Sequence, residues 1–333
     1  MGPPVRVCLV MPFRNEAEHL SSVLASLRAQ TYDPARVELI AIDDGSEDGG
    51  AALVEAWLRE TGWNGRVIRA ESRSIPSSLN RALAHVAPDA YVIRLDAHSL
   101  YAADYIATIM TAFDDLPADV WCVGGSADPT DSSRFGRALH AALFTNPMGL
   151  GNADYRREQM RPVSSVYLGA WRPGVLAKVG GYDTRWRANE DAELAERIRE
   201  AGGIVVRVPA RSYKIMTRGA RAALVQWTRY GFWRAQTMVR HPRTLRFRHV
   251  APTLAVLTAI ALLASPARIL FVPLYLAYAI ATVACRPPGQ RPIITLASLI
   301  YFPLVHAGYG CGILFGTLIS LIAPRDDGAR AAS

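Results

Sequence analysis

Acidic residues are missing from a long part of this sequence. The 333 residues include 29 Asp and Glu, but none of these lies between Glu200 and Asp326. The same part of the chain holds arginines that precede long apolar runs: Arg229, Arg234, Arg240, Arg243, Arg246 and Arg248. Basic residues beside apolar runs are typical of proteins at a membrane surface. No recognised nucleic-acid module accompanies the net charge of +8, so the pattern favours membrane lipid as a partner and argues against nucleic acid.

Cysteine is scarce as well, and the four cysteines form no Cys-x-x-Cys pair and no metal-ligand spacing: Cys8, Cys122, Cys285 and Cys311. We interpret them as small buried hydrophobic residues. We also expect no secretory signal, because Arg14, Asn15 and Glu16 follow the first apolar run, where a cleavage site would be expected. The N-terminal domain is therefore expected to stay in the cytoplasm.

In the first half of the chain, short apolar runs alternate with amphipathic helical patterns. The runs predicted as strands are Val5–Met11, Val37–Ile42, Arg66–Ala70 and Tyr91–Leu95. The first helix is expected to begin at a capping box formed by Asn15 and Glu18. The alternation predicts an α/β fold, a mostly parallel Rossmann-like sheet with flanking helices. Ligands bind beyond the carboxyl ends of the strands in such sheets, and polar residues follow several of these runs.

The last third of the chain is apolar. It contains runs of 15, 17 and 31 residues: Val250–Ala264, Ile269–Cys285 and Ile293–Ala323. A spanning helix needs about 20 apolar residues, so residues 250–323 are predicted to form about three transmembrane helices. The flanking arginines would lie on the cytoplasmic side, which gives a hairpin through Ser265–Arg268 and then a third span. A set of buried core helices is the alternative interpretation.

Three further segments complete the expected organisation. Residues 219–249 carry aromatic residues among arginines, a pattern typical of an amphipathic helix in the lipid headgroup region. Residues 1–218 would form the α/β domain, and residues 324–333 would form a short tail.

Two polar segments follow the first two predicted strands. Pro12–Glu16 follows the first strand, and Asp43–Ser46 follows the second. A loop at a helix N-terminus offers free N–H groups to a phosphate, and a carboxylate at a strand end can accept hydrogen bonds from a base or a ribose. The two segments therefore indicate a nucleotide site, with a simple polar turn as the alternative for Asp43–Ser46.

A third polar segment, Arg94–His98, follows the strand at Tyr91–Leu95. Asp96 and His98 are two residues apart, so in an extended chain their side chains point the same way. They could hold a divalent cation that bridges two phosphates, because carboxylate oxygens suit Mg²⁺ and an added imidazole suits Mn²⁺. A strand-end cap is the alternative.

Two more motifs lie further along the chain. Asn189–Glu193 opens a predicted helix, where carboxylates either cap the helix dipole or supply a general base for an acceptor hydroxyl. Gln226, Arg229 and Tyr230 have helical i, i+3, i+4 spacing and share one helix face. An interfacial aromatic and basic stripe is the alternative for this second motif.

The five motifs occur together in the order and approximate spacing of family 2 glycosyltransferases, which this chain resembles over roughly residues 5–240. The resemblance implies a GT-A fold for residues 1–218. The Asp-Ala-His form of the metal motif, the segment Gly180–Asp183 and the apolar C-terminal runs resemble the succinoglycan branch of that family. Members of this branch build lipid-linked exopolysaccharide repeats.

The resemblance also implies residue roles. The nucleotide-binding residues would be Pro12, Arg14, Glu16, Asp44 and Asp96, with Glu16 and Asp44 at the base and ribose. Asp96 and His98 would hold the divalent cation, Mn²⁺ or Mg²⁺, and Asp191 would be the catalytic base beside Glu190. Gln226, Arg229 and Tyr230 would lie near the diphosphate or the acceptor.

Two departures from the family pattern refine these expectations. The metal motif ends in His98, where Asp is more common, which leaves the metal identity open. Tyr230 stands where processive synthases have Trp, and we expect no span before the first domain, so single addition is favoured over polymerisation.

We therefore predict an inverting glycosyltransferase, a multi-pass protein of the cytoplasmic membrane with its catalytic domain in the cytoplasm. It would move a sugar from a nucleotide-sugar donor, expected to be a UDP-sugar, to a polyprenyl-linked saccharide acceptor in exopolysaccharide or cell-envelope glycan assembly. A polyprenyl-phosphate sugar synthase and a catalytically inactive, membrane-tethered nucleotide-binding scaffold are the alternatives.

Overall fold

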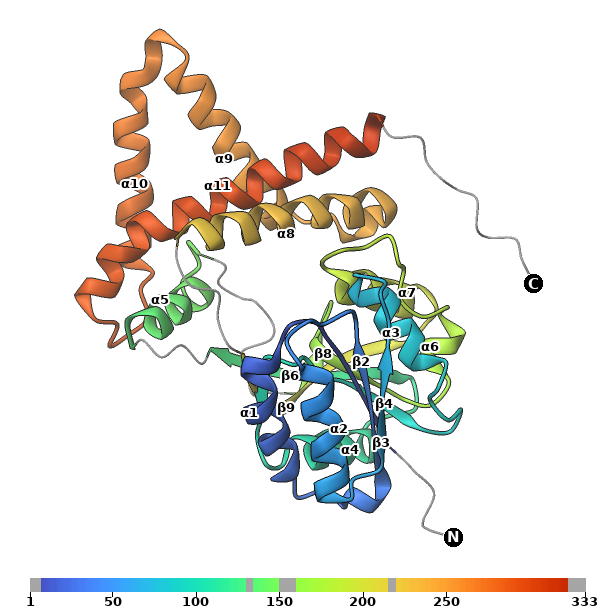
Figure 1. The fold of residues 1–333 in the computed structure, drawn as a ribbon. Coiled ribbons are helices and arrows are strands. Elements are labelled where there is room, and N and C mark those ends of the chain that lie inside the picture. Colours follow the sequence, from blue (N-terminus) through green and yellow to red (C-terminus); the bar gives the residue numbers. More distant parts are fainter. Residues whose placement is uncertain (1–6, 130–133, 150–159, 215–219, 323–333) are drawn as a thin grey trace. The chain divides into compact units, whose positions relative to one another are not determined.

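The computed structural model of the chain describes residues 7–129, 134–149, 160–214 and 220–322 (Figure 1). These residues form two compact units. The first unit contains residues 7–129 and 160–214, and the second contains residues 134–149 and 220–322. The second unit therefore includes a segment that is inserted into the sequence of the first. The tail expected at 324–333 lies outside the described residues.

The first half of the sheet is parallel. Its strands are β1 (Val7–Phe13), β2 (Val37–Asp43), β3 (Gly65–Arg69) and β4 (Tyr91–Arg94), in the order β3-β2-β1-β4. The connections contain α1 (Ala17–Arg28), the 3-10 helix η1 (Pro34–Arg36), α2 (Gly50–Thr61) and α3 (Ile75–Leu83). This is the alternation that the apolar runs predicted, because parallel neighbours need crossover connections.

The second half of the sheet is mixed. It contains β5 (Ser99–Tyr101), β6 (Val120–Pro129), β7 (Arg161–Pro162), β8 (Tyr167–Trp171) and β9 (Ile204–Lys214). The order continues as β4-β8-β6-β9-β5, with β7 paired to β9, and β8 is antiparallel to both of its neighbours. Antiparallel neighbours need no crossover helix, and the helix between β6 and β8 belongs to the second unit. The α/β fold with flanking helices is confirmed, and its sheet is more mixed than the sequence predicted.

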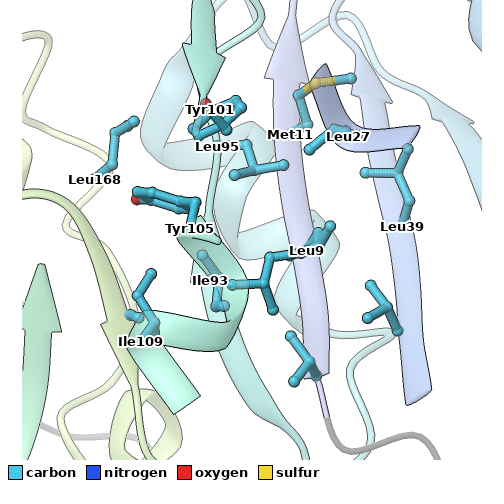
Figure 2. Packing of buried hydrophobic residues seen from close by; sticks show 14 of the residues in the cluster. Leu9, Met11, Leu27, Leu39, Ile93, Leu95, Tyr101, Tyr105, Ile109 and Leu168 are labelled. Atoms are coloured by element: carbon cyan, nitrogen blue, oxygen red, sulfur yellow. The ribbon is translucent and has the colours of Figure 1, made fainter. Parts of the chain in front are cut away.

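Hydrophobic cores cover both faces of the sheet. On one face, α1, α2 and α4 (Tyr105–Asp115) pack against alternate strand residues such as Leu9, Met11 and Leu39 (Figure 2). On the other face, α3, α6 (Val175–Lys178) and α7 (Glu190–Glu200) pack against the intervening residues, including Cys8 and Val10. Burial of β1 on both faces explains its continuous apolar sequence, and it fixes the strand ends where the polar residues stand.

The second unit is helical. It contains α5 (Arg134–Thr145), α8 (Ala220–Arg240), α9 (Phe247–Leu263), α10 (Phe271–Ala284), α11 (Pro292–Ile322) and the 3-10 helices η3 (Pro242–Thr244) and η4 (Pro266–Leu270). Two of these segments, Pro266–Ala284 and Pro292–Ile322, are long and apolar enough to cross a membrane. A third segment, His249–Leu263, is apolar but shorter. They correspond to the three apolar runs of the sequence.

Candidate active site

The three polar loops of the first unit lie at one edge of the sheet. Strands β2, β1 and β4 are adjacent and parallel, so their carboxyl ends meet at the same edge. The loops are tied to the strands, since the Asp44 N–H donates to the Phe13 carbonyl at 2.9 Å. Glu16, Asp44 and Asp96 therefore follow three neighbouring strands, as the sequence spacing predicted. Pro12, the next-to-last residue of β1, is half-buried, and Arg14 is exposed in the loop that follows the strand.

Asn15 joins the loops after β1 and β2. Its backbone is left-handed, with φ of 53°, a conformation that Asn tolerates better than most residues. Its N–H donates to Ser46 Oγ at 3.0 Å, and its Oδ1 accepts the Glu47 N–H at 2.8 Å. These two bonds give the double loop a fixed shape at the proposed nucleotide site.

The capping box expected from Asn15 and Glu18 is wrong. Helix α1 begins after Glu16, whose side chain makes no capping bond. Its first N–H group, on Ala17, instead donates to Asp48 Oδ2 at 2.7 Å, and this bond lowers the pKa of the Asp48 carboxyl. Because Asn15 is bonded to Ser46 and Glu47, the helix is capped instead by the carboxylate of Asp48 from the neighbouring loop.

Asp44 holds the loop that follows β3. Its Oδ1 accepts the Ser72 hydroxyl and the Arg73 N–H, both at 2.9 Å, and its Oδ2 accepts the Ser74 N–H at 2.8 Å. Burial opposes ionisation, but these bonds outweigh it and lower the pKa of Asp44. Three of about four acceptor positions on the carboxylate are thus occupied within the protein. In this structure the carboxylate shapes the nucleotide loop, and direct contact with a nucleotide remains a prediction.

Glu16, Asp96 and His98 meet at the ends of β1 and β4. His98 Nδ1 lies 3.3 Å from Glu16 Oε1, and His98 Nε2 lies 3.9 Å from Asp96 Oδ2. Among the residues that the structure describes, no group of three or more His, Cys, Asp or Glu side chains has the geometry of a metal site. The pair of Asp96 and His98 still fits part of a site for a divalent cation, because one carboxylate and one imidazole suit Mn²⁺ and leave other positions for phosphate oxygens.

Asp96 is held in its ionised form. Its Oδ2 accepts the Tyr167 hydroxyl at 3.1 Å, and its backbone N–H donates to the Tyr101 hydroxyl at 2.7 Å. Burial opposes ionisation, but Arg94, Lys214 and His98 lower the pKa of Asp96 below its usual range. A carboxylate that stays charged at neutral pH is suited to bind a cation.

Arg94, the last residue of β4, connects the two halves of the site. It is 5% exposed, and its Nη1 donates to Glu190 Oε1 at 3.0 Å and to Asp191 Oδ1. Its Nη2 lies 3.5 Å from Asp96 Oδ1. One buried guanidinium therefore joins a carboxylate at the end of a strand to two carboxylates at the start of α7.

Asp191 has the environment of a proton acceptor. Burial, with contributions from Glu190 and Asp96, raises its pKa to about 7, although Arg94 opposes the shift. Asp191 also lines a small and mostly apolar cavity, together with Cys122, Val166, Gly169, Trp171, Leu194, Ala195 and Ile198. Glu193 of the same motif is instead paired with Arg197 at 2.7 Å, a structural role.

Comparison with known proteins identifies the first unit. Residues 8–170 match the sequence model described as Glycosyl transferase family 2. The chain contains a family 2 glycosyltransferase domain. The matched segment includes the polar loops after β1, β2 and β4 and ends before Asp191, so this residue's assignment rests on the contacts with Arg94.

Two curated relatives carry related names. The Succinoglycan biosynthesis protein ExoA of Rhizobium meliloti is 28% identical over 265 residues, which cover 73% of each chain. ExoU of the same organism is 23% identical over 220 residues, which cover 65% of this chain and 63% of that protein. The glycosyltransferase domain is thus related to proteins of succinoglycan biosynthesis, as the sequence motifs predicted.

Solved structures confirm the fold. A mannosyltransferase from Pyrobaculum calidifontis, in complex with GDP-Man and Mn²⁺, matches with a TM-score of 0.60 at 19% identity and covers 95% of this chain and 87% of its own. TarS of S. aureus in complex with UDP-GlcNAc matches with a TM-score of 0.54 at 12% identity and covers 95% and 91%. At these identities the likeness shows the fold alone, which is GT-A.

The motif on α8 belongs to the second unit. The Gln226 amide donates to the Tyr230 hydroxyl at 3.1 Å, and the Trp227 ring meets the Tyr230 ring edge-on at 5.5 Å. Arg229 is exposed on the same helix. The structure thus brings Gln226 and Tyr230 together, and their role near the diphosphate or acceptor remains a prediction.

Sequence reasoning missed three residues of the glycosyltransferase domain's site. Arg94 had a signal, because a buried arginine at a strand end needs carboxylate partners. Tyr167 and Lys214 had none. They stand on β8 and β9, and their approach to Asp96 follows from the mixed half of the sheet.

Proposed function

We propose that the chain is an inverting glycosyltransferase that moves a sugar from a nucleotide-sugar, a UDP-sugar in our prediction, to a lipid-linked saccharide. The acceptor would belong to exopolysaccharide or cell-envelope glycan assembly. The observation that carries the proposal is the Arg94 cluster, because it brings the predicted base and the predicted cation ligand into one site. The complexes of the neighbouring folds with GDP-Man and UDP-GlcNAc, and the names of the succinoglycan relatives, support this choice of substrates.

In the proposed reaction, the ionised Asp191 accepts the proton of the acceptor hydroxyl. The hydroxyl oxygen forms a bond to the anomeric carbon while the bond from that carbon to the diphosphate oxygen breaks. The nucleoside diphosphate leaves with the electron pair, and one displacement inverts the configuration. A pKa of about 7 suits this role, because general bases work best when their pKa lies near the working pH. Glu190, bonded to the same guanidinium, would keep Asp191 in place.

The donor would lie at the sheet edge beside Glu16, Asp96 and His98. Asp96 and His98 would hold a divalent cation, Mn²⁺ or Mg²⁺, which when bound supplies positive charge to the departing diphosphate. Pro12, Arg14 and the loop held by Asp44 would contact the nucleotide, because they lie at or beyond the carboxyl ends of neighbouring parallel strands.

The second unit would attach the enzyme to the cytoplasmic membrane as a multi-pass protein, with the glycosyltransferase domain on the cytoplasmic side. Its described residues include twelve arginines and no lysine, aspartate or glutamate, a composition that fits anionic lipid. A polyprenyl-linked acceptor fits the same surface, and Gln226, Arg229 and Tyr230 would lie near its diphosphate.

The test compares Asp191→Asn with Asp104→Asn in membranes that contain the full chain. Asp104 is an exposed carboxylate at the start of α4 and makes no capping bond, so its variant controls for charge. Nucleotide release is measured with UDP- and GDP-sugars, with and without lipid acceptor and Mn²⁺. We expect Asp191→Asn to bind donor normally and to lose about 10²–10⁴-fold in turnover. Unchanged turnover would remove Asp191 from the mechanism, and a lipid product with one sugar and one phosphate would assign a sugar-phosphate synthase instead.

A further inference from the structure

Helix α11 is apolar and 31 residues long, yet the helix beside it is strongly basic. Three glycines, spaced four residues apart, bring α11 against α8. A Cβ at Gly308 would lie 3.0 Å from the Leu224 carbonyl oxygen, one at Gly316 would lie 2.6 Å from that of Phe232, and Gly312 faces the Thr228 carbonyl. The backbones of the two helices are therefore in contact along the C-terminal half of α11.

Helix α8 is unsuited to the hydrocarbon region of a bilayer. Its 21 residues include four arginines, Arg221, Arg229, Arg234 and Arg240, and no acidic residue. Charged side chains near the middle of a spanning helix are costly and rare. Helix α8 therefore belongs in the headgroup region, and the half of α11 that is packed against it must lie at a similar depth.

Both helices of the α9–α10 hairpin contact α11. Pro252 and Thr253 of α9 meet α11 at Gly310, where the Thr253 hydroxyl is 3.4 Å from the Gly310 carbonyl oxygen. The Tyr275 hydroxyl of α10 donates to the Leu299 carbonyl at 2.9 Å. The two contacts on α11 are eleven residues apart, or about 16 Å at 1.5 Å per residue. A helix that touches both legs in this way runs across the hairpin, as Figure 1 shows for these elements.

The inserted segment gives a second indication of depth. Three side-chain bonds attach residues 146–149 to the second half of α10 and to α11: Asn146 to the Thr282 carbonyl at 2.9 Å, Tyr278 to the Met148 carbonyl at 3.3 Å, and His306 to the Gly149 carbonyl at 3.1 Å. Thr282 is near the end of α10, whereas His306 is in the middle of α11. The middle of α11 thus lies at the level where the hairpin begins.

The hairpin itself has the features of a membrane insertion. Its legs, residues 247–263 and 266–284, are about 25 and 28 Å long, close to the roughly 30 Å of a bilayer core. Apolar side chains are exposed around both legs, among them Leu257, Ile260, Leu263, Ile269, Val272 and Ile280. Arg268 is the one arginine at the tip, whereas Arg243, Arg246, Arg286 and Arg291 flank the base. This asymmetry places the base on the cytoplasmic side.

We propose that the α9–α10 hairpin is the part of the chain that crosses the bilayer, and that α11 lies beside α8 along the cytoplasmic face. Arg268 then reaches the far headgroup region, and the C-terminal end of α11 stays on the side of the first unit. Only five residues separate β9 from α8, at most about 18 Å of chain, so the first unit is on that side as well. The proposal rests on the membrane attachment proposed above.

The test determines the sidedness of four positions of the full chain in inverted membrane vesicles. Two are tags at Met1 and after Ser333. The other two are single reactive cysteines. One is the native Cys285 at the base, in a chain whose Cys311 is serine. The other is Ala267→Cys at the tip, in a chain whose Cys285 and Cys311 are both serine. Cys8 and Cys122 are buried and should stay unreactive.

We expect a protease to cut both tags from the cytoplasmic side. A membrane-impermeant maleimide should label Cys285 from that side and the tip cysteine only from the other. A protected C-terminal tag beside a cleaved N-terminal tag would mean that α11 crosses, and it would overturn the proposal. Labelling of the tip from the cytoplasmic side would overturn it too. Release of the chain by alkaline carbonate would instead contradict membrane attachment itself, while the nucleotide-release assay tests the sugar transfer separately.

Discussion

Replacement of Arg94 by glutamine should damage the first unit far more than an ordinary loss of an ion pair. The change keeps a polar side chain of similar length and removes the only cation that joins Asp96, Glu190 and Asp191 among the described contacts. Because Arg94 is 5% exposed, water cannot replace it. Removal of one partner from a buried ion pair costs about 3–5 kcal/mol.

The matched control is Arg66→Gln. Arg66 pairs with Glu38 at 2.6 Å in the same sheet, but its side chain is 52% exposed. The Glu38 side chain is 11% exposed, but water can reach the position of the lost guanidinium, so the loss should cost about 1 kcal/mol, the upper end for exposed pairs. Hydrogen–deuterium exchange of the β1 and β4 peptides in the full chain reports opening of the first unit alone. We expect exchange to speed up by about 10²–10⁴-fold in Arg94→Gln and by less than about 10-fold in Arg66→Gln.

The penalty should also depend on pH, in a direction that the structure fixes. Burial raises the pKa of Asp191 from 3.8 to about 7, so the folded state holds this proton more tightly and loses stability as pH rises through that window. Arg94 opposes the shift, so its removal raises the pKa of Asp191 further. Above about pH 7 the native carboxyl ionises beside Arg94, whereas the variant must either keep the proton or hold a charge without that partner. The penalty should therefore be larger at pH 8 than at pH 5, where Asp191 is protonated in both chains. Equal exchange in both arginine variants, or a penalty that is the same at both pH values, would refute the reasoning.

Three further predictions follow from the contacts. Activity should rise as pH increases through about 7, because Asp191 must lose its proton to act as a base, and a profile of kcat/KM that is flat between pH 6 and 8 would contradict this. Asp44→Asn should lower the free energy of unfolding by about 1–3 kcal/mol and should speed hydrogen exchange in residues 72–74, because it weakens the bonds to the Arg73 and Ser74 N–H groups. Asp104→Asn is the control. Unaltered exchange of residues 72–74 in Asp44→Asn would count against the role given to Asp44. Gly312→Ala should make the second unit more sensitive to limited proteolysis, because its Cβ would overlap the Thr228 carbonyl. Cys311→Ala, on the exposed side of the same helix, should not. Equal resistance of the two variants would argue against tight packing of α8 on α11.

The strand ends were predictable from the sequence because their signals are local. A buried parallel strand requires an unbroken apolar run, so the point where the run stops marks the sheet edge. Asp44 and Asp96 were located in this way, without knowledge of the rest of the fold. The start of α1 was mispredicted because a competing acceptor, Asp48, lies in another loop, and local spacing carries no information about it.

The Arg94 cluster was only half predictable. The sequence marked Asp96 and Asp191 separately, but their union depends on how α7 packs. Leu194 and Ile198 bury one side of α7 against the sheet, which turns Asp191 toward Arg94. That packing involves the mixed half of the sheet, where short strands and an inserted helix leave no simple periodic signal.

The proposed position of α11 differs from the third span that its length predicts. Hydropathy treats each helix alone, and an apolar run of this length predicts a span. The glycines at 308, 312 and 316 carry the opposing signal, because small residues spaced four apart indicate close packing against another helix. When the partner is as basic as α8, that packing restricts where the apolar helix can lie.

The charges of the site give a physical reason for the proposed divalent cation. Asp96, Glu190 and Asp191 gather around Arg94, and Glu16 lies beside His98. Lys214 and His98 add to the effect of Arg94 in lowering the pKa of Asp96. The proposed nucleoside diphosphate would add further negative charge to this edge of the sheet, and buried like charges repel strongly. A divalent cation held by Asp96 and His98 would offset the charge of the diphosphate. It would leave Asp191 unneutralised, as the proposed role of a base requires. The proposed cation would thus stabilise the negative charge of the leaving group, whereas the buried Arg94 guanidinium stabilises the carboxylates.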